Sequence, residues 1–285
     1  MCERKGGADI ERTKIRFANS KIKTIIVLVL IVALGISAMV GTYQALLSNA
    51  RTMGMELVRS YCADEERNIA VYRTYIRMGL YYLEELENSS YSKQELTHKM
   101  ENFLKRTAAV VGDSDLQSCV MKNGEEIASN INDKSSLKNY QNTDWYYKAR
   151  KAAGDVVFCN VAEEKSERGE LTVVAAVEPF SGNAIAIFLE RENYQNIHMD
   201  LKLMDQGAYY LFDENGRLLF YDAPFMVDED ATEEYAANMC QKIKEGSLDK
   251  TGGGIVDITG RKRDIYHCTV SNGWLCVMTV PRYIL

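Results

Sequence analysis

The sequence predicts an α+β protein with a transmembrane helix, a long α-helix that emerges from the membrane, and two domains built on antiparallel sheets. The run from Thr24 to Ala50 contains no Asp, Glu, Lys or Arg. The stretch that follows it, to about Glu87, is poor in Gly and Pro and repeats its apolar residues at helical spacing. Beyond Glu87, short apolar segments alternate with turn signals, and this pattern occurs twice.

The charge-free run is long enough to cross a bilayer, since about 20 helical residues span a hydrocarbon core of about 30 Å. It is densely aliphatic from Ile25 to Val40. A cleaved signal peptide is the rival interpretation, because Ser48 and Ala50 would suit a cleavage site. The apolar stretch of a signal peptide is, however, only about 7 to 15 residues long. We therefore expect an uncleaved transmembrane helix over residues 24–47.

Residues 1–23 form a basic tail in which Lys and Arg outnumber Asp and Glu. Basic residues are retained on the cytoplasmic side of a membrane, so the N-terminus is expected in the cytoplasm and everything after Ala50 outside. The whole chain has a formal net charge of -6, and the part outside is more acidic still because the tail is basic. This charge argues against nucleic acid and an anionic membrane surface as partners and fits a neutral or cationic solute.

All cysteines except Cys2 follow the span, and none of them forms a CxxC motif, so zinc binding and thioredoxin-like chemistry have no support. Cys268 and Cys276 flank residues 271–273. A three-residue loop there would place the two cysteines opposite each other across a hairpin, and a two-residue loop would place them on opposite faces. The sequence leaves both registers open. The alternative for all these cysteines is that they are small buried hydrophobic residues.

Residues 48–87 are predicted to form the long helix. Its apolar stripe consists of Leu57, Tyr61, Tyr72, Tyr75, Ile76, Leu80 and Leu83. The length of this stripe leads us to expect a homodimer through the long helix. Ser92 and Glu95 make a capping box for a second helix. The buried face of that helix is predicted to carry Leu96, Met100, Phe103, Leu104 and Ala108.

Turn chemistry divides the remaining chain into strands. Asn123-Gly124 tolerates the positive φ angles of a tight hairpin, and the same device returns at Asn215-Gly216 and Asn272-Gly273. Strands are expected at residues 156–159, 171–177, 184–189, 255–258, 264–270 and 274–280, and a helix at 232–245. Residues 252–254, all Gly, are interpreted as a flexible link. Because each half supplies a hairpin and later strands, two similar sheet domains in tandem are predicted.

Three segments behind the anchor and the long helix resemble the extracytoplasmic double Cache (dCache) sensor of bacterial transmembrane receptors. They are residues 140–149 around Trp145, the hairpin at 207–217, and the closing segment 272–281. The resemblance covers about Leu46 to Leu285. It implies two PAS-like domains, each with a five-stranded antiparallel sheet, a membrane-distal one at 88–200 that holds the ligand and a membrane-proximal one at 201–285.

The resemblance also implies a second membrane span and a cytoplasmic output region after the last strand. Such outputs are a chemotaxis signalling region, a histidine kinase or a cyclic-di-GMP synthase. Because the chain stops at Leu285, where that span would begin, we expect a sensor that lacks its output domain.

The segment around Trp145 is the candidate ligand site. Flat aromatic faces together with Asp144 could hold an organic solute or cation, whereas the alternative is that the rings only seal the core. The resemblance implies that dCache members that bind amino acids carry an Arg at the position of Thr143 and an Asp on a later strand. This chain has Glu190 at the end of that strand. A hydroxyl does not replace a bidentate guanidinium, so an amino acid ligand is disfavoured. The pocket positions carried over are Tyr140, Thr143, Asp144, Trp145, Tyr146 and Glu190.

No catalytic, metal or cofactor site is expected. His98, His198 and His267 lie on separate predicted elements, and the loop that begins at Asp213 lacks the later Glu of a calcium-binding loop. The sequence therefore predicts a protein of the cell membrane that is not an enzyme and that senses a small molecule for transmembrane signalling. The alternative is a membrane-tethered scaffold or partner-binding protein with no small-molecule ligand.

Overall fold

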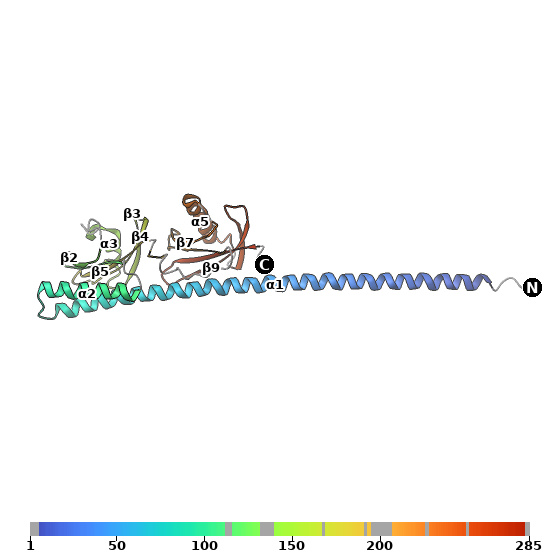
Figure 1. The fold of residues 1–285 in the computed structure, drawn as a ribbon, viewed down its shortest axis with the longest axis horizontal. Helices are drawn as coiled ribbons and strands as arrows, with labels where there is room; N and C mark the ends of the chain where they lie inside the picture. Colours follow the sequence, from blue (N-terminus) through green and yellow to red (C-terminus); the bar gives the residue numbers. More distant parts are fainter. Residues whose placement is uncertain are drawn as a thin grey trace, which may run out of the picture. The chain divides into compact units, whose positions relative to one another are not determined.

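The computed structural model describes residues 6–111, 116–131, 140–166, 169–190, 193–194, 207–225, 228–248 and 251–282. The chain forms two compact units, one that ends at Met53 and one from Gly54 to Ile284 (Figure 1). The helices are α1 (Gly6–Glu87), α2 (Lys93–Val111), η2 (Tyr140–Asn142), α3 (Asp144–Lys151) and α5 (Glu229–Lys244). The strands are β1 (Gln117–Lys122), β2 (Glu125–Ser129), β3 (Val157–Ser166), β4 (Gly169–Val177), β5 (Ala184–Glu190), β6 (Ala208–Phe212), β7 (Leu218–Asp222), β8 (Thr251–Val256), β9 (Lys262–Thr269) and β10 (Leu275–Pro281).

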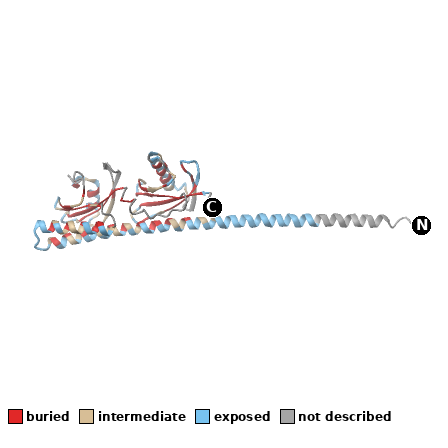
Figure 2. Cartoon of the chain, viewed as in Figure 1, coloured by how far each residue is buried: buried red, intermediate tan, exposed pale blue. Residues whose placement is uncertain are grey.

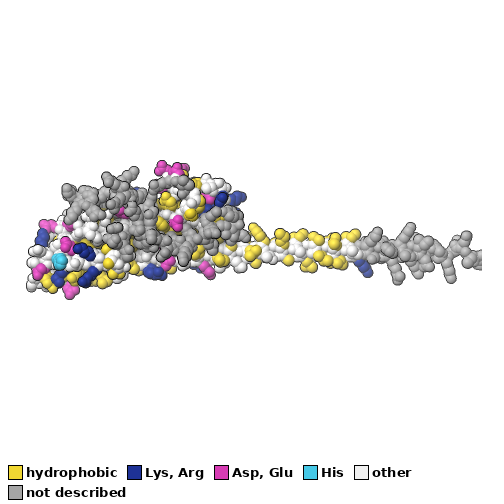
Figure 3. Space-filling model, in the orientation of Figure 1, with side chains coloured by type: hydrophobic (Ala, Val, Ile, Leu, Met, Phe, Trp, Pro, Cys, Tyr) yellow, Lys and Arg dark blue, Asp and Glu magenta, His cyan; other side chains and the backbone are white. Residues whose placement is uncertain are grey.

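The first unit is the N-terminal part of α1, and its described side chains are exposed along the apolar run (Figures 2 and 3). One described helix, over Lys23–Glu87, is long and apolar enough to cross a membrane, with a mean hydropathy of 2.7 in its most apolar window. This agrees with membrane anchoring through the predicted segment. Residues 1–5 and the side chains before Lys23 lie outside the described part, so the orientation stays a prediction.

The second unit holds two five-stranded antiparallel sheets with the same strand order. The first sheet runs β2-β1-β5-β4-β3 and the second β7-β6-β10-β9-β8. In each sheet the last of the five strands along the chain lies next to the first, β5 beside β1 and β10 beside β6, so the two sheets have the same topology. The predicted fold class is therefore confirmed, while the domain boundaries at residues 88, 200 and 201 stay predictions.

Local signals fold as the sequence indicated. In the β1–β2 turn, Asn123 and Gly124 have φ angles of 50° and 90°, values that suit a tight hairpin. At the start of α2, the Ser92 amide donates to the Glu95 carboxylate at 2.9 Å, and the Glu95 amide donates to the Ser92 hydroxyl at 3.3 Å. This reciprocal pair is the predicted capping box.

The second-unit part of α1 lies along both sheets. Tyr61, Tyr72, Ile76 and Leu83 from the apolar stripe are at most 9% exposed, because they pack on the sheets of the same chain (Figure 2). Most of this stripe is thus not available to a second copy, and the reason for expecting a homodimer through it was wrong. Homodimerisation itself stays a prediction.

Different helices pack on the two faces of each sheet (Figure 1). Helices α1 and α2 pack on one face of the first sheet, and α3 packs on the other. In the second sheet, α1 covers one face and α5 the other. Side chains alternate between the faces, so Val174 joins the α1 side and Val173 the α3 side.

Two features of the second sheet differ from what the sequence indicated. Residues 252–254 belong to the edge strand β8 and are not a flexible link; Gly253 and Gly254 pair with β9. A Cβ on Gly254 would lie 2.9 Å from the Arg282 guanidinium, so Gly leaves room for this side chain.

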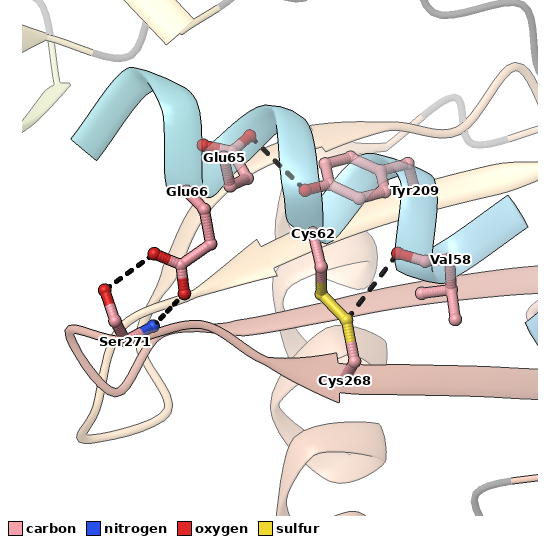
Figure 4. Close-up of a disulfide and its surroundings, with 7 residues drawn as sticks. All are labelled: Val58, Cys62, Glu65, Glu66, Tyr209, Cys268 and Ser271. Carbon is pink, nitrogen blue, oxygen red and sulfur yellow. Dashed lines mark hydrogen bonds between the residues drawn. A yellow bond between two sulfur atoms is a disulfide. The ribbon is translucent and has the colours of Figure 1, made fainter. Parts of the chain in front are cut away.

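The cysteine pairing is the second difference. Cys268 and Cys276 are register partners, as the three-residue loop required, yet Cys268 forms a disulfide with Cys62 of α1 (Figure 4). Beside this disulfide, Glu66 of α1 accepts hydrogen bonds from the Ser271 amide at 2.5 Å and the Ser271 hydroxyl at 2.7 Å. A covalent bond and two hydrogen bonds therefore fasten α1 to the second sheet.

Candidate functional site

The candidate site lies on the face of the first sheet that α3 covers. Thr143 begins α3 as its N-cap, since its hydroxyl accepts from the Tyr146 amide at 3.4 Å. The same hydroxyl donates to the Tyr140 carbonyl at 2.5 Å. Thr143 thus fixes the start of α3 and with it the direction in which the neighbouring aromatic side chains point toward the sheet. Its hydroxyl makes hydrogen bonds to backbone groups.

Four aromatic rings form one buried cluster under α3. Trp145 lies 6.1 Å from Tyr140, 5.9 Å from Tyr146 and 6.2 Å from Phe188 of β5, between ring centroids. Tyr140 and Tyr146 are 5.1 Å apart in an edge-to-face arrangement. All four rings are at most 5% exposed. A solute can therefore reach these faces only beneath the surface of the domain.

The hydroxyl of Tyr140 is one of the polar groups inside this cluster. It is buried without a hydrogen bond of ordinary geometry among the described residues, and burial raises the pKa of Tyr140. Leaving a buried hydroxyl unsatisfied costs about 1–3 kcal/mol, so such a group is a candidate for contact with water or a ligand.

Glu190 places a carboxylate on the same face of the sheet. It follows Phe188 by two positions on β5, and side chains two apart on a strand share a face. Glu190 is 9% exposed and accepts a hydrogen bond from the Gln117 amide at 3.0 Å, while its own backbone amide donates to Asn193 at 2.6 Å. The first sheet thus offers a nearly buried carboxylate near the end of the strand that carries Phe188.

Asp144 does not join the cluster. Its side chain is 66% exposed and pairs with Lys148 one turn later on α3, at 2.7 Å. The hydrogen bond that Lys148 donates to the Asp144 carboxylate raises the pKa of Lys148.

The structure therefore brings Tyr140, Trp145 and Tyr146 together, puts Glu190 on their face of the sheet, and leaves Asp144 in solvent. Sequence reasoning missed Phe188 and Gln117. Strand alternation back from Glu190 could have indicated Phe188, whereas Gln117 comes from β1 and is placed there by the pairing of β1 with β5.

The candidate site is linked to α1 through β5. A Cβ on Gly79 of α1 would lie 2.5 Å from the Cδ1 atom of Ile185 on β5, so the two elements are in close contact at this glycine. Just before β5, the Asn183 amide donates to Glu87 at the end of α1, at 3.0 Å, and Glu87 also pairs with Lys122 at 3.0 Å. These contacts join β5 and the residue just before it to α1.

The two sheet regions also contact each other within the second unit. Phe158 of β3 and Tyr194 both pack edge-on against Trp274, with ring centroids 5.4 and 6.0 Å away. The Asn160 amide of β3 donates to Asp213 at the β6–β7 turn. No group of three or more metal-ligating side chains occurs within the described ranges.

No family model matches the sequence, and no curated protein is similar to it. Solved structures of sensor domains do resemble the chain. The ligand-binding domain of Campylobacter jejuni chemoreceptor Tlp3 in complex with 4-methylisoleucine has a TM-score of 0.58 at 12% identity, over 84% of this chain and 93% of that chain. The extracellular domain of the putative histidine kinase soHK1S-Z6 has a TM-score of 0.57 at 14% identity, over 85% and 98%.

These similarities, at such low identity, concern the fold. They agree with the element order described above, a long N-terminal helix followed by two antiparallel five-stranded sheets. The predicted resemblance is thereby confirmed at the level of architecture. The chain has the double Cache fold found in ligand-binding domains of chemoreceptors and extracellular domains of histidine kinases.

Proposed function

We propose that this protein is a membrane-anchored receptor that senses a small organic solute in the extracytoplasmic compartment. The aromatic cluster of Tyr140, Trp145, Tyr146 and Phe188 carries the proposal. It combines large apolar faces with an unsatisfied hydroxyl, and Glu190 adds a nearly buried carboxylate on the same face of the sheet. Small-molecule sites are usually lined by apolar and aromatic side chains together with a small number of polar groups.

Two features support an extracytoplasmic position for the second unit. The basic tail before the span favours a cytoplasmic N-terminus. The disulfide between Cys62 and Cys268 lies beyond the span, and disulfides persist in oxidising compartments. Both features give the same orientation although their physical causes are independent.

The proposed ligand is a cationic or neutral organic solute. Solved Tlp3 domains hold isoleucine and valine, which carry a carboxylate. In this chain the hydroxyl of Thr143 bonds to backbone groups at the start of α3, and Glu190 places a carboxylate on the face of the aromatic cluster. Aromatic faces and a carboxylate attract an ammonium group and repel a carboxylate.

Signalling follows from the contacts of β5. A ligand that binds better to one position of β5 on α1 shifts the population toward that position, by as much as its affinities for the two states differ. Because α1 continues from Glu87 back to the apolar run, its displacement would reach the membrane. We propose an output of the chemoreceptor, histidine kinase or cyclic-di-GMP synthase type.

The test is thermal unfolding of the full chain in lipid nanodiscs, followed by Trp fluorescence. Primary amines, quaternary ammonium compounds and aliphatic amino acids are compared at equal concentration. We expect an amine to raise Tm because it binds the folded state, Glu190→Gln to abolish the shift, and the matched exposed variant Asp144→Asn to retain it.

Two outcomes would contradict the proposal in different ways. If amino acids raised Tm and amines did not, the proposed class of ligand, a cationic or neutral organic solute, would be wrong. No shift with any solute would favour the partner-binding alternative.

A further inference from the structure

A groove runs between α5 and β8, the strand at one edge of the second sheet. It has a volume of about 460 Å³. Its polar lining on the helix side comes from Glu234, Asn238 and Lys242, and residues 254–258 line the strand side. Asp257 is already paired with Arg263 at 3.3 Å, and both side chains are 1% exposed. The side-chain charges that remain for a bound partner are therefore those of α5.

The strand side of the groove is a sheet edge with unpaired backbone groups. An edge strand directs every second amide and carbonyl away from its neighbour. The Asp257 amide donates to the Arg261 carbonyl at 2.9 Å, so Asp257 and Ile255 face β9. Gly254 and Val256 therefore direct their backbone groups outward, and within the described residues these groups make no backbone hydrogen bond outside the sheet. Pro, Lys or another charge commonly protects such an edge, and β8 contains none of them.

The helix side of the groove carries three polar side chains at intervals of one helical turn. Glu234, Asn238 and Lys242 are exposed, and none of these side chains makes a hydrogen bond or ion pair with another described residue. Residues four apart in a helix are separated by about 6 Å, and alternate residues of a strand by about 6.7 Å on one face. Three alternate side chains of an added strand would therefore lie opposite these three residues.

The direction of α5 relative to β8 follows from its two ends. Early in α5, Tyr235 lies near Asp257, just after the end of β8: burial raises the pKa of this phenol, and the nearby carboxylate raises it further. Late in α5, Ile243 lines a smaller cavity together with Thr269, the last residue of β9. Because β9 is antiparallel to β8, it ends beside the start of β8. Helix α5 therefore runs opposite to β8.

We propose that the groove binds an extended segment of another polypeptide, which pairs with β8 as an additional antiparallel strand. Antiparallel pairing is the one used throughout this sheet, and here it makes the segment run along α5, past Glu234 and then Lys242. The complementary segment has a basic residue, a hydrogen-bonding residue two positions later and an acidic residue four positions later. Backbone bonds to β8 supply affinity, and the alternate side chains supply specificity.

The residues between these three are apolar. Ile255 packs under α5, so the side chain of Val256 points to the other face of the sheet, where it is 53% exposed. The intervening side chains of the segment lie on that face and pack against Val256. This surface gives the protein a polypeptide partner in addition to the small ligand proposed above, and it shares no residue with the aromatic cluster of the first sheet.

The test measures peptide binding to the full chain in nanodiscs by fluorescence anisotropy. The probe is a labelled, end-capped heptapeptide, Thr-Lys-Val-Thr-Val-Glu-Thr, and the comparison peptide has its Lys and Glu exchanged. The exchange turns two attractive contacts with α5 into two repulsive ones. We therefore expect saturable binding of the probe and binding of the exchanged peptide that is about tenfold weaker.

Methylation of the peptide backbone tests the strand pairing. In the proposed register the two Val amides face β8, whereas the amides of the central Thr and of Glu face away from it. N-methylation of both Val amides should abolish binding. The same modification of the central Thr and of Glu should retain it, because these amides do not pair with β8.

Charge reversal in the protein assigns the binding to the groove. The double variant Glu234→Lys with Lys242→Glu should prefer the exchanged peptide, by about the same factor as the wild type prefers the probe. The matched control, Glu84→Lys with Lys105→Glu at exposed positions of α1 and α2, should keep the wild-type preference. Glu190→Gln should leave peptide binding unchanged, so this test and that of the first-sheet site fail separately.

The absence of saturable binding of either peptide would overturn the proposal. So would equal binding of both charge orders, or a preference that the double variant in α5 leaves unchanged. A groove that instead held the β8 edge of a second copy would give dimers and no peptide binding, and this result too would overturn the proposal.

Discussion

The disulfide between Cys62 and Cys268 should contribute a large part of the stability of the second unit. The two residues are 206 positions apart, and a crosslink stabilises chiefly by restricting the unfolded chain. The chain-entropy relation gives about 5 kcal/mol for a span of this length, while measured losses are typically about 2–4 kcal/mol. We therefore expect Cys268→Ser to lower the free energy of unfolding by about 2–5 kcal/mol.

The assay is urea unfolding of the full chain in nanodiscs, followed by the fluorescence of Trp274, which is 2% exposed in the core that α1 shares with the sheets. Cys62→Ser, Cys268→Ser and the double variant should lose the same amount, because each removes the same crosslink. A reductant should destabilise the wild type to the level of these variants and leave the variants unchanged.

Cys240→Ser is the matched control, because Cys240 is buried and unpaired. A reductant should still destabilise this variant by the full amount. The reasoning is refuted if the oxidised and reduced wild type unfold at the same urea concentration, or if the double variant loses the sum of the two single losses.

Three further changes test the packing described above. Gly79→Leu should cost about 1–3 kcal/mol in urea unfolding, because a Cβ there already comes within 2.5 Å of Ile185. Thr143→Ala should cost about 1 kcal/mol through the lost N-cap of α3, with Thr143→Ser close to wild type in the same assay. For Asp257, burial alone would raise its pKa, but hydrogen bonds from Thr259, Arg261 and Arg263 outweigh this and hold the pKa below 3.8. The contribution of Asp257 to the free energy of unfolding is therefore fully present above pH 3.8 and is lost as the pH falls through the lowered pKa of the folded state. Asp257→Asn should lower the free energy of unfolding by about 3–5 kcal/mol at pH 7, and this loss relative to the wild type should become smaller in acid.

Much of the fold could be predicted because its signals are local. The capping box of Ser92 and Glu95 joins residues three apart, and the Asn123-Gly124 turn depends on the φ angles of two neighbours. The long helix follows from the spacing of apolar residues along one segment. In each case the residues that decide the structure lie within a few positions of one another, so their pattern is visible in the sequence.

The candidate site was predictable only in part. The aromatic residues near Trp145 lie within one short segment and were found together. Phe188 completes the cluster from a strand far along the chain, and Asp144 points into solvent although it is next to Trp145. Which neighbour turns inward depends on how α3 sits on the sheet, and that is a tertiary contact.

The sequence by itself determined the apolar run, the long helix, the tight turns and the repetition of two sheet-forming halves, because these depend on composition and short-range geometry. Only the tertiary structure decided that Cys268 joins Cys62 although Cys276 is its strand partner. It also decided that residues 252–254 form an edge strand and that the helix stripe is covered by the chain's own sheets. These outcomes depend on which surfaces meet when α1 packs across both sheets, and no short stretch of sequence contains that information.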